Sequence, residues 1–269
     1  MRRRTFTVLL VLTVTVLPLI LPNAYAATRT LGYLSVKGTW IVDANGQKVL
    51  LRGVNYPGYQ SQQPNGGIAL HRESAYRTFA QMGFNVVRLP ISWAMLEPTP
   101  GVFRVAYLKW YVDRDVQWAK KYGLYIILDM HQYNWANKFG GSGVPEWAVH
   151  PYAPNFAGLR EAVSNFWADN NLQDHFLMVW RNIAQYYAKE PTIAGYDILN
   201  EPWIYTSVNP DLNATHVDAL YARAIQVIRA VDPNHIIFLE PANMNTFKLP
   251  TTDNIVWSPH YYPLAFAQK

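Results

Sequence analysis

The stretch Tyr196-Asp197-Ile198-Leu199-Asn200-Glu201-Pro202-Trp203 decides how the rest of the sequence is interpreted. An apolar run over residues 193–199 ends abruptly in an amide, a carboxylic acid and a proline. Because Pro202 cannot donate to a sheet ladder and disfavours helix at the residue before it, the pattern predicts a buried strand followed by a polar loop. Glu201 then stands at the end of a rigid strand beside Asn200, which suits a residue that takes part in acid–base chemistry.

Five further apolar runs follow the same pattern. Each is predicted to be a strand that ends in polar side chains, at Asn55, Arg88, His131, Glu240 and His260-Tyr261-Tyr262. The runs lack polar alternation and are separated by helical patterns, which indicates a parallel sheet covered on both faces. A doubly wound sheet would carry a Gly-rich phosphate loop after its first strand, and residues 52–58 are not one. We therefore predict an α/β fold, a (β/α)₈ TIM barrel of which about six β/α units are present, with its functional face at the polar strand ends.

Helical spacing and turn residues place the other elements. Helices are predicted over about 73–82, 105–122, 172–187 and 216–231. The last begins with a capping-box pattern, Thr215-x-x-Asp218, and a long aromatic and Gly-rich loop is predicted over about 132–170. Asn45-Gly46 predicts a hairpin between residues 40–42 and 48–51. With no repeat or linker, residues 27–269 are predicted to form one domain, incomplete at its C-terminus.

The N-terminus has the three parts of a secretory signal peptide. Met1-Arg2-Arg3-Arg4 is basic, residues 6–21 carry no charge, and Ala24-Tyr25-Ala26-Ala27 offers small residues for cleavage after Ala26. An uncleaved membrane anchor is the alternative, but the apolar run is short and rich in Thr. We predict that residues 1–26 are removed, that the protein is secreted, and that no stable membrane span is left.

Composition argues against several other classes of protein. Half of the 269 residues are hydrophobic and 14% are aromatic, which supports a large core. The formal charge of +5 falls once the three leading arginines are removed and no other Lys/Arg cluster is present, so no nucleic-acid partner is expected. With no cysteine, the chain has no disulfide, thiol nucleophile or Cys-based zinc site. Neither a metal nor a cofactor is predicted.

The strand ends carry the parts of a glycosidase site. Such a site needs two carboxyl groups at the glycosidic bond, donors to the sugar 2-hydroxyl and aromatic walls for the apolar face of the sugar. Glu201 can supply the acid and Asn200 the donor. Trp135 and Trp203 are the preferred walls. We expect no more than half of the full set of candidates to contact sugar, namely Trp93, Tyr133, Trp135, Trp147, Trp203, Trp257 and Tyr261.

Five segments together resemble glycoside hydrolase family 5, the cellulase family A. They occur in that family's order and span most of the mature chain: Arg52-Gly53-Val54-Asn55, Asn85-Val86-Val87-Arg88-Leu89-Pro90, Asp129-Met130-His131, Leu199-Asn200-Glu201-Pro202 and His260-Tyr261-Tyr262. The resemblance implies a retaining β-glycosidase on a (β/α)₈ barrel.

For the site, the resemblance implies that Glu201 is the acid/base and that Asn200 binds the 2-hydroxyl. The other matched residues would hydrogen-bond the nucleophile (Arg88 and Tyr262) or orient the site and the −1 sugar (His131 and His260). A guanidinium keeps a nearby carboxylate ionised, and that negative charge raises the pKa of the second carboxyl group. We therefore expect the pKa of Glu201 to be raised.

The sequence departs from the family pattern at the nucleophile. In the family this residue is a Glu at the end of the seventh strand, whereas this chain ends soon after the sixth, and the family's eighth-strand Trp is not found either. Asp253 precedes its strand, on the stability face, and Glu240 lies on the strand next to Glu201, so neither is expected to substitute. We expect a C-terminally truncated gene product that is inactive as it stands.

Three hypotheses follow. The first is a secreted endo-acting β-glycosidase that hydrolyses β-1,4-linked polysaccharide, cellulose or β-glucan first, with mannan or glycolipid headgroups as alternatives. The second is a non-catalytic protein that binds β-linked polysaccharide or oligosaccharide. The third is a metal hydrolase that uses Asp129, His131, Glu201 and His260, which is disfavoured because the first strand lacks a His-x-His pattern.

Overall fold

The structure, a computed structural model, describes residues 30–59, 70–242 and 253–262. Its centre is a parallel sheet in which each strand pairs with the next one along the chain. These are the six strands that the sequence predicts: β3 (Gly53–Asn55), β4 (Val86–Ile91), β5 (Tyr125–Met130), β6 (Ile193–Asp197), β7 (Ile236–Leu239) and β8 (Ile255–Trp257). The order is that of a partial (β/α)₈ barrel. The predicted signal peptide lies outside the described residues.

The register of the sheet brings the carboxyl ends of the strands to one edge. Asn55 of β3 pairs with Arg88 of β4, and Asp129 of β5 pairs with Asp197 of β6. Side chains on one face of neighbouring strands therefore point into the same space. This register brings Asn55, Arg88, Asp129 and Asp197 to one edge, and the segments that follow β5 to β8 carry the other polar groups beyond the same edge.

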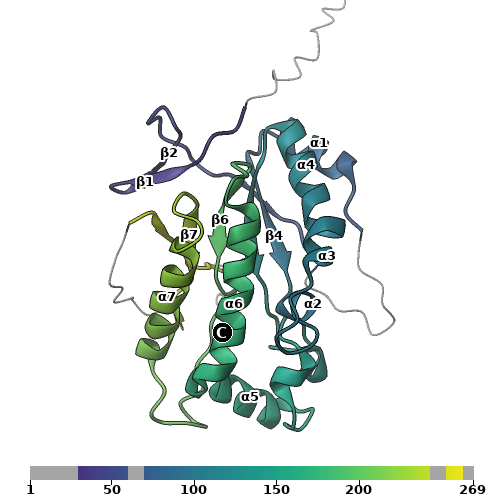
Figure 1. The fold of residues 1–269 in the computed structure, drawn as a ribbon, viewed down its shortest axis with the longest axis vertical. Coiled ribbons are helices and arrows are strands. Elements are labelled where there is room, and N and C mark those ends of the chain that lie inside the picture. The colour runs from purple at the N-terminus through teal and green to yellow at the C-terminus, as the bar shows by residue number, and fades with distance from the viewer. Residues whose placement is uncertain (1–29, 60–69, 243–252, 263–269) are drawn as a thin grey trace, which may run out of the picture.

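Helices pack around the outside of the sheet (Figure 1). In chain order they are α1 (Glu73–Gln81), α2 (Trp93–Leu96), α3 (Val105–Tyr107), a π-helical turn η1 (Leu108–Val112), α4 (Asp113–Tyr122), two short 3₁₀ turns η2 (Asn137–Phe139) and η3 (Glu146–Val149), α5 (Phe156–Ala168), α6 (Asn170–Tyr187) and α7 (Ala214–Arg229). The predicted helices are all present, although the second is divided into α3, η1 and α4. Within the described ranges no helix is both long enough and apolar enough to cross a membrane.

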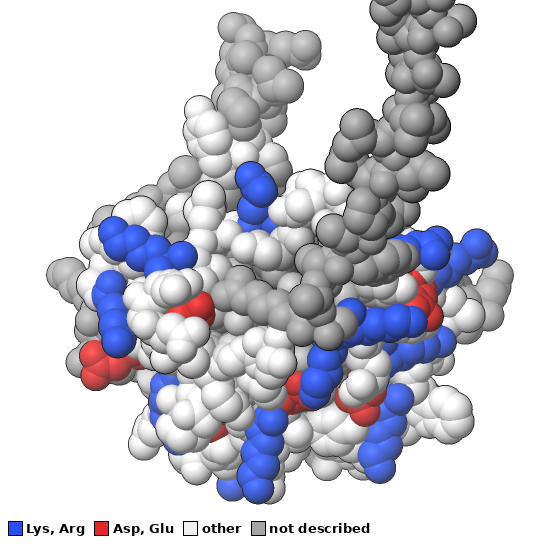
Figure 2. Space-filling model, turned by 90° about the horizontal axis from the view of Figure 1, so that it is seen from above, with Lys and Arg blue, Asp and Glu red and all other residues white. Residues whose placement is uncertain are grey.

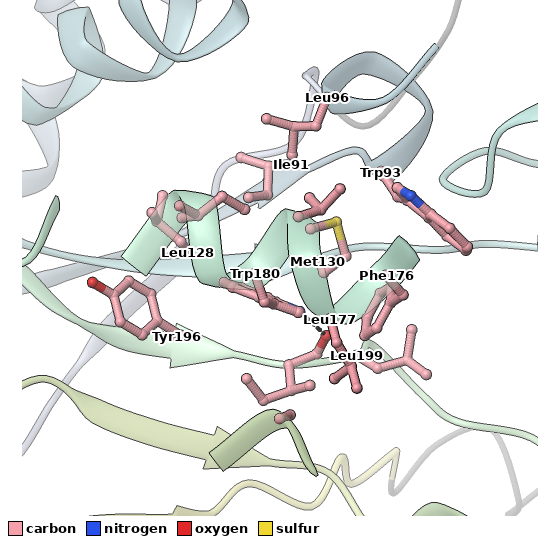
Figure 3. Packing of buried hydrophobic residues seen from close by; sticks show 14 of the residues in the cluster. Ile91, Trp93, Leu96, Leu128, Met130, Phe176, Leu177, Trp180, Tyr196 and Leu199 are labelled. Carbon is pink, nitrogen blue, oxygen red and sulfur yellow. Dashed lines mark hydrogen bonds between the residues drawn. The ribbon is translucent and has the colours of Figure 1, made fainter. Parts of the chain in front are cut away.

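The main core lies between the sheet and α6. Leu177 and Trp180 of α6 point towards Met130 of β5 and Tyr196 of β6 (Figure 3). The Trp180 indole is fully buried, and its Nε1 donates to the carbonyl oxygen of Ile198 at 3.0 Å. Because this bond satisfies the polar atom of a buried ring, α6 is anchored directly to the segment that follows β6.

A small hairpin closes the end of the sheet where the strands begin. β1 (Ser35–Lys37) and β2 (Trp40–Val42) pair antiparallel with each other. Apolar side chains of this region pack on the first residues of the strands, in a cluster that includes Leu34, Ile41, Val86, Tyr125, Ala194 and Ile236. Seen from this side, Lys and Arg side chains are spread around the rim with Asp and Glu among them (Figure 2).

The predicted hairpin is displaced along the chain. The turn at Asn45-Gly46 is present, since the Gly46 amide donates to the Asp43 carbonyl at 2.9 Å. Its second arm, however, makes only an isolated bridge between Lys48 and Val42. β1 and β2 are instead joined by a turn that contains Gly38, whose φ of +60° is a conformation that glycine adopts readily.

Two further predictions about local structure are wrong. Residues 132–170 are not a loop throughout, because α5 forms there, and the side chain of its N-cap residue, Asn155, accepts from the Gly158 amide at 2.9 Å. The N-cap of α7 is Asn213 and not Thr215, and His216 completes the capping box. The Gly and Pro residues around α5 obscured the helical spacing of its apolar side chains.

Candidate active site

Side chains of β4, of the last residues of β5 and β6, and of the segments that follow β5 to β8 form one connected polar network. It joins six of the predicted site residues, Arg88, His131, Asn200, Glu201, His260 and Tyr262, through the carboxylates of Asp129, Asp197 and Glu240. In a barrel this edge of the sheet is the face on which active sites are built. The network therefore marks the candidate active site.

Glu201 is held by its backbone as well as by its side chain. Its φ is +45°, a left-handed conformation that is uncommon for a residue with a Cβ. The Glu201 amide donates to Oε2 of Glu240 at 2.7 Å, and its carbonyl accepts from Nε2 of Gln132 at 3.1 Å. Backbone strain of this kind persists only where the surroundings fix it, and it is typical of functional sites.

The carboxylate of Glu201 is an acceptor in the described arrangement. Its Oε1 accepts from Nδ1 of His260 at 2.7 Å and from the hydroxyl of Tyr262. The hydrogen bond from His260, followed by that from Tyr262, outweighs burial and lowers the pKa of Glu201 to about 2. The same contact and a second one to Glu240 raise the pKa of His260 to about 10, and Glu201 raises the pKa of Tyr262 to about 12.

The expectation of a raised pKa for Glu201 is wrong for this arrangement. It assumed that a carboxylate would face Glu201 directly. The groups that touch the Glu201 carboxylate are instead an imidazole and a phenol, both donors, and Glu240 faces its amide. With two donors on its carboxylate, this arrangement favours the ionised, base form of Glu201.

Arg88 lies at the centre of the network. Its guanidinium contacts Asp129 and Asp197 at 2.8 Å each and Glu240 at 2.7 Å. Burial lowers the pKa of Arg88, but the charges of the three carboxylates raise it by more. The net pKa is raised, so the guanidinium stays charged. Burial, and next the charge of Glu240, raise the pKa of Asp197 well above its ordinary value despite Arg88. The predicted partner of Arg88 was the nucleophile; in the described residues its ion-pair partners are these three buried acids.

Asn200 and His131 stay close to Arg88. The side-chain oxygen of Asn200 accepts from Arg88 at 3.2 Å, while its amide group donates to the Gln132 carbonyl at 3.0 Å. Nδ1 of His131 lies 2.7 Å from Oδ2 of Asp129, the oxygen that also binds Arg88. Their assignments to the 2-hydroxyl and to the sugar remain predictions.

The aromatic candidates fall into two groups. Trp93 is 1% exposed and hydrogen-bonds Glu97 in the core, and the Trp147 ring packs against it, so Trp93 is not a wall. Trp203, 51% exposed, borders a cavity of about 240 Å³ beside Glu201. Trp135 also lines this cavity but is 3% exposed and packs on Phe166, which leaves little of its ring for a ligand. Tyr133, Trp257 and Tyr261 are exposed.

Sequence reasoning missed two residues of the site. Gln132 donates to the carbonyl oxygens of both Asn200 and Glu201, at 3.0 and 3.1 Å, and so fixes the turn that presents them. Glu240 was considered only as a nucleophile, yet it contacts Arg88, His260 and the Glu201 amide. Both residues follow a strand, Gln132 two residues after β5 and Glu240 directly after β7. These positions were the sequence feature that could have identified them as site residues.

The residues that could have formed a metal centre do not do so. Across the described part of the chain, no group of three or more His, Asp or Glu side chains has an arrangement that could hold a metal ion. The metal-hydrolase hypothesis needs Asp129, His131, Glu201 and His260. Their side chains instead pair with Arg88, with Tyr262 and with one another.

Comparison with known proteins agrees with this geometry. The profile of the Cellulase family (glycosyl hydrolase family 5) matches residues 42–269. A beta-xylosidase of Phanerodontia chrysosporium is 29% identical over 81% of this chain and 47% of its own length. Endoglycoceramidase I of Rhodococcus hoagii is 28% identical over 85% of this chain and 52% of its own length.

Solved structures give the same result for the fold. The crystal structure of an endogalactoceramidase superimposes with a TM-score of 0.75 at 31% identity, over 86% of this chain and 60% of the other. This chain spans about half the length of the curated relatives that it matches. Since the family profile covers most of the sequence and the six-stranded sheet carries the family's residues at its strand ends, the chain belongs to glycosyl hydrolase family 5.

Proposed function

We propose that this chain carries the acid/base part of a retaining β-glycosidase. The observation that supports this best is Glu201, which lies four residues after the end of β6 in a left-handed conformation beside an aromatic-lined cavity, with His260 and Tyr262 on its carboxylate. A retaining glycosidase needs one carboxyl group to protonate the leaving oxygen and then to deprotonate water.

Glu201 can perform both steps by exchanging a proton with His260. In the described form Glu201 is ionised, which is the state that accepts a proton from water. His260, whose Nδ1 lies 2.7 Å from Glu201, holds a proton that can return to the carboxylate. A second carboxylate across the sugar, about 5–5.5 Å away, would favour this return because its charge raises the pKa of Glu201.

Glu240 is a poor candidate for the nucleophile. It is 2% exposed, and its two oxygens accept from Arg88, His260 and the Glu201 amide. Since it is almost fully buried and both of its oxygens are engaged, this carboxylate is not open to the anomeric carbon of a bound sugar. Labelling the full-length protein with a 2-deoxy-2-fluoro-β-glycoside would identify the nucleophile by mass spectrometry. A label on Glu240 would overturn this assignment.

The substrate is proposed to be a β-linked glycan, and two classes compete. The family profile favours the β-1,4-glucan that the sequence predicts. A glycolipid is the second class, and a specific observation favours it: an endoglycoceramidase and an endogalactoceramidase align over 85% and 86% of this chain. Exposed apolar rings near Glu201, including Phe156 and Trp203, also suit a ligand that is partly lipid.

The test is hydrolysis by the full-length protein of soluble β-1,4-glucan, mannan and a glucosylated ceramide in parallel. NMR of the first product should show the β-anomer, because retention requires two displacements. An α-anomer would contradict the double-displacement mechanism. Tight binding of one glycan with no turnover would favour the non-catalytic binding protein.

Secretion is part of the proposal. Residues 1–26 have the pattern of a cleavable signal peptide. Expression of the full-length protein in a secreting host, followed by N-terminal sequencing of the exported form, should show a new terminus at Ala27. Protein retained in the cell with Met1 intact would contradict this.

A further inference from the structure

Glu240 joins the two groups that handle the proton. It follows β7, is 2% exposed, and accepts from three donors that come from three different parts of the chain. We propose that Glu240 is a positioning residue that fixes both the backbone of Glu201 and the imidazole of His260 for proton transfer. The inference rests on the proposed role of Glu201 as acid/base.

The first link is to the backbone of Glu201. Its amide donates to Oε2 of Glu240 at 2.7 Å, a short distance typical of a bond to an ionised acceptor. This bond pairs the amide of a residue at φ +45°, a conformation that costs about 1–3 kcal/mol and needs support from its surroundings. Glu240 therefore helps to set the direction in which the Glu201 side chain leaves the turn.

The second link is to His260. Its imidazole lies between two carboxylates, with Nδ1 2.7 Å from Oε1 of Glu201 and Nε2 3.0 Å from Oε1 of Glu240. Both ring nitrogens thus face acceptors, an arrangement that only the doubly protonated ring satisfies. The other groups that face the ring are Tyr262, with its hydroxyl 3.1 Å from Nδ1, and Arg88, whose charge opposes protonation.

Glu240 is itself held rigidly. Nη2 of Arg88 donates to its Oε1 at 2.7 Å, and the Tyr221 hydroxyl donates to its backbone carbonyl at 2.9 Å. Because its carboxylate and its backbone carbonyl are both held, Glu240 can keep the Glu201 amide and the His260 ring in fixed positions. A mobile surface acid could not do this.

The chain offers a matched control in Glu97. This carboxylate is also buried, at 3% exposure, and it accepts from a histidine, a backbone amide and a third donor: His175 at 2.6 Å, Gly101 at 2.7 Å and Trp93 at 2.8 Å. Glu97→Gln also replaces a buried carboxylate that accepts from a histidine and a backbone amide, but it changes no contact of Glu201 or His260. Both variants should lose comparable stability to thermal unfolding.

The experiment titrates His260 by NMR in the full-length protein, with its signal assigned by His260→Gln. In Glu240→Gln the midpoint of the His260 titration should fall by about 1–3 pH units, because one of two opposite charges is lost. In Glu97→Gln it should stay in place. An unchanged midpoint in Glu240→Gln would overturn the proposal, whatever the activity of the enzyme.

Kinetics supply the second readout. Glu240→Gln should lower kcat about 10- to 100-fold with KM changed less than about twofold, since the acid/base is misplaced while sugar contacts stay. The alkaline limb of the pH profile should move towards lower pH. Equal losses of kcat in Glu240→Gln and Glu97→Gln would refute a positioning role. If wild type hydrolyses no glycoside, the proposed function fails, and the NMR result still decides the role of Glu240.

Discussion

Two carboxylate–histidine clusters, one buried and one partly exposed, stand at opposite ends of the sheet. Before β7, Asp232 pairs with His235 three residues later, and Tyr196 donates to Asp232 at 2.6 Å. After β6 and β7, Glu201 and Glu240 enclose His260. The first cluster is built mainly from one turn of the chain, whereas the second joins separate segments: Glu201 lies 39 residues before Glu240 and 59 residues before His260.

The two clusters differ most in how their charges are balanced. Asp232 has its Oδ1 occupied by the amides of Asn234 and His235, and its Oδ2 occupied by His235 and Tyr196. The second cluster is part of the polar network around Arg88. There three carboxylates share one guanidinium, and one oxygen each of Asp129 and Asp197 has no hydrogen-bond partner among the described residues. A fully hydrogen-bonded cluster is typical of a structural role, whereas unsatisfied buried polar atoms and shifted pKa values, as in the network around Arg88, are typical of functional sites.

The largest effect is expected from Glu201→Gln. Cleavage of unactivated glycans by the full-length protein should fall about 10³- to 10⁴-fold, because a poor leaving group needs a proton. Aryl glycosides with good leaving groups should lose far less in the step that breaks the glycosidic bond. The control is Asp232→Asn, which changes the other cluster and should leave both rates near wild type. Equal losses on both substrates would remove Glu201 from the acid role.

Arg88→Met should destabilise the fold by about 3–5 kcal/mol at neutral pH, because three buried acids lose their counterion. The pKa of Asp197, which burial and Glu240 already raise, should then rise further. A raised carboxylate pKa gives stability that is present below the unfolded value and is lost as pH rises. Urea unfolding should therefore show the variant losing most stability towards high pH. A loss that is independent of pH would contradict this.

Asp232→Asn should cost about 1–3 kcal/mol, because donors from His235 and Tyr196 lose a charged acceptor. Burial raises the pKa of Asp232, but the hydrogen bond and charge of His235 and the bond from Tyr196 outweigh it, so the net pKa is lowered. The contribution is then present above the unfolded value of about 3.9 and is lost as pH falls. The difference between wild type and variant should shrink below about pH 4, the opposite trend to Arg88→Met.

The same contrast explains what could be predicted from the sequence. The six strands were predictable because each is a continuous apolar run, and Glu201 was predictable because Asn200 and Pro202 flank it at a strand end. α5 was missed although Leu159, Ala162 and Val163 are spaced as in a helix, because a loop rich in aromatic residues and glycine surrounds it. A single local pattern, such as a continuous apolar run, can be recognised in a sequence. Where helical spacing and loop-forming residues overlap, as in α5, neither pattern predicts the structure reliably.

The electrostatics of the site could not be predicted in the same way. The pKa of Glu201 depends on His260 and Tyr262, which lie 59 and 61 residues further along the chain. The direction of the shift follows from which atoms touch which, and the sequence places these residues only at the same end of the sheet. Glu240 was undervalued for the same reason, since its partner in the Glu201 backbone is an amide that any residue would carry.

The smallest effect is expected from Trp203→Ala, and it extends the comparison to aromatic side chains. Trp203 is 51% exposed beside the cavity at Glu201, and Trp110 on η1 is 72% exposed away from the polar network. The fold should tolerate Trp203→Ala, because the contact that Trp203 makes with Trp167 uses its backbone carbonyl, at 2.7 Å. An aromatic contact contributes about 0.5–1.5 kcal/mol, so KM for the glycan should rise about 2- to 12-fold with kcat little changed. Trp110→Ala should leave KM unchanged. If both variants raise KM equally, exposure of a tryptophan and not its place at the strand ends governs the effect, and Trp203 is not a sugar-binding wall.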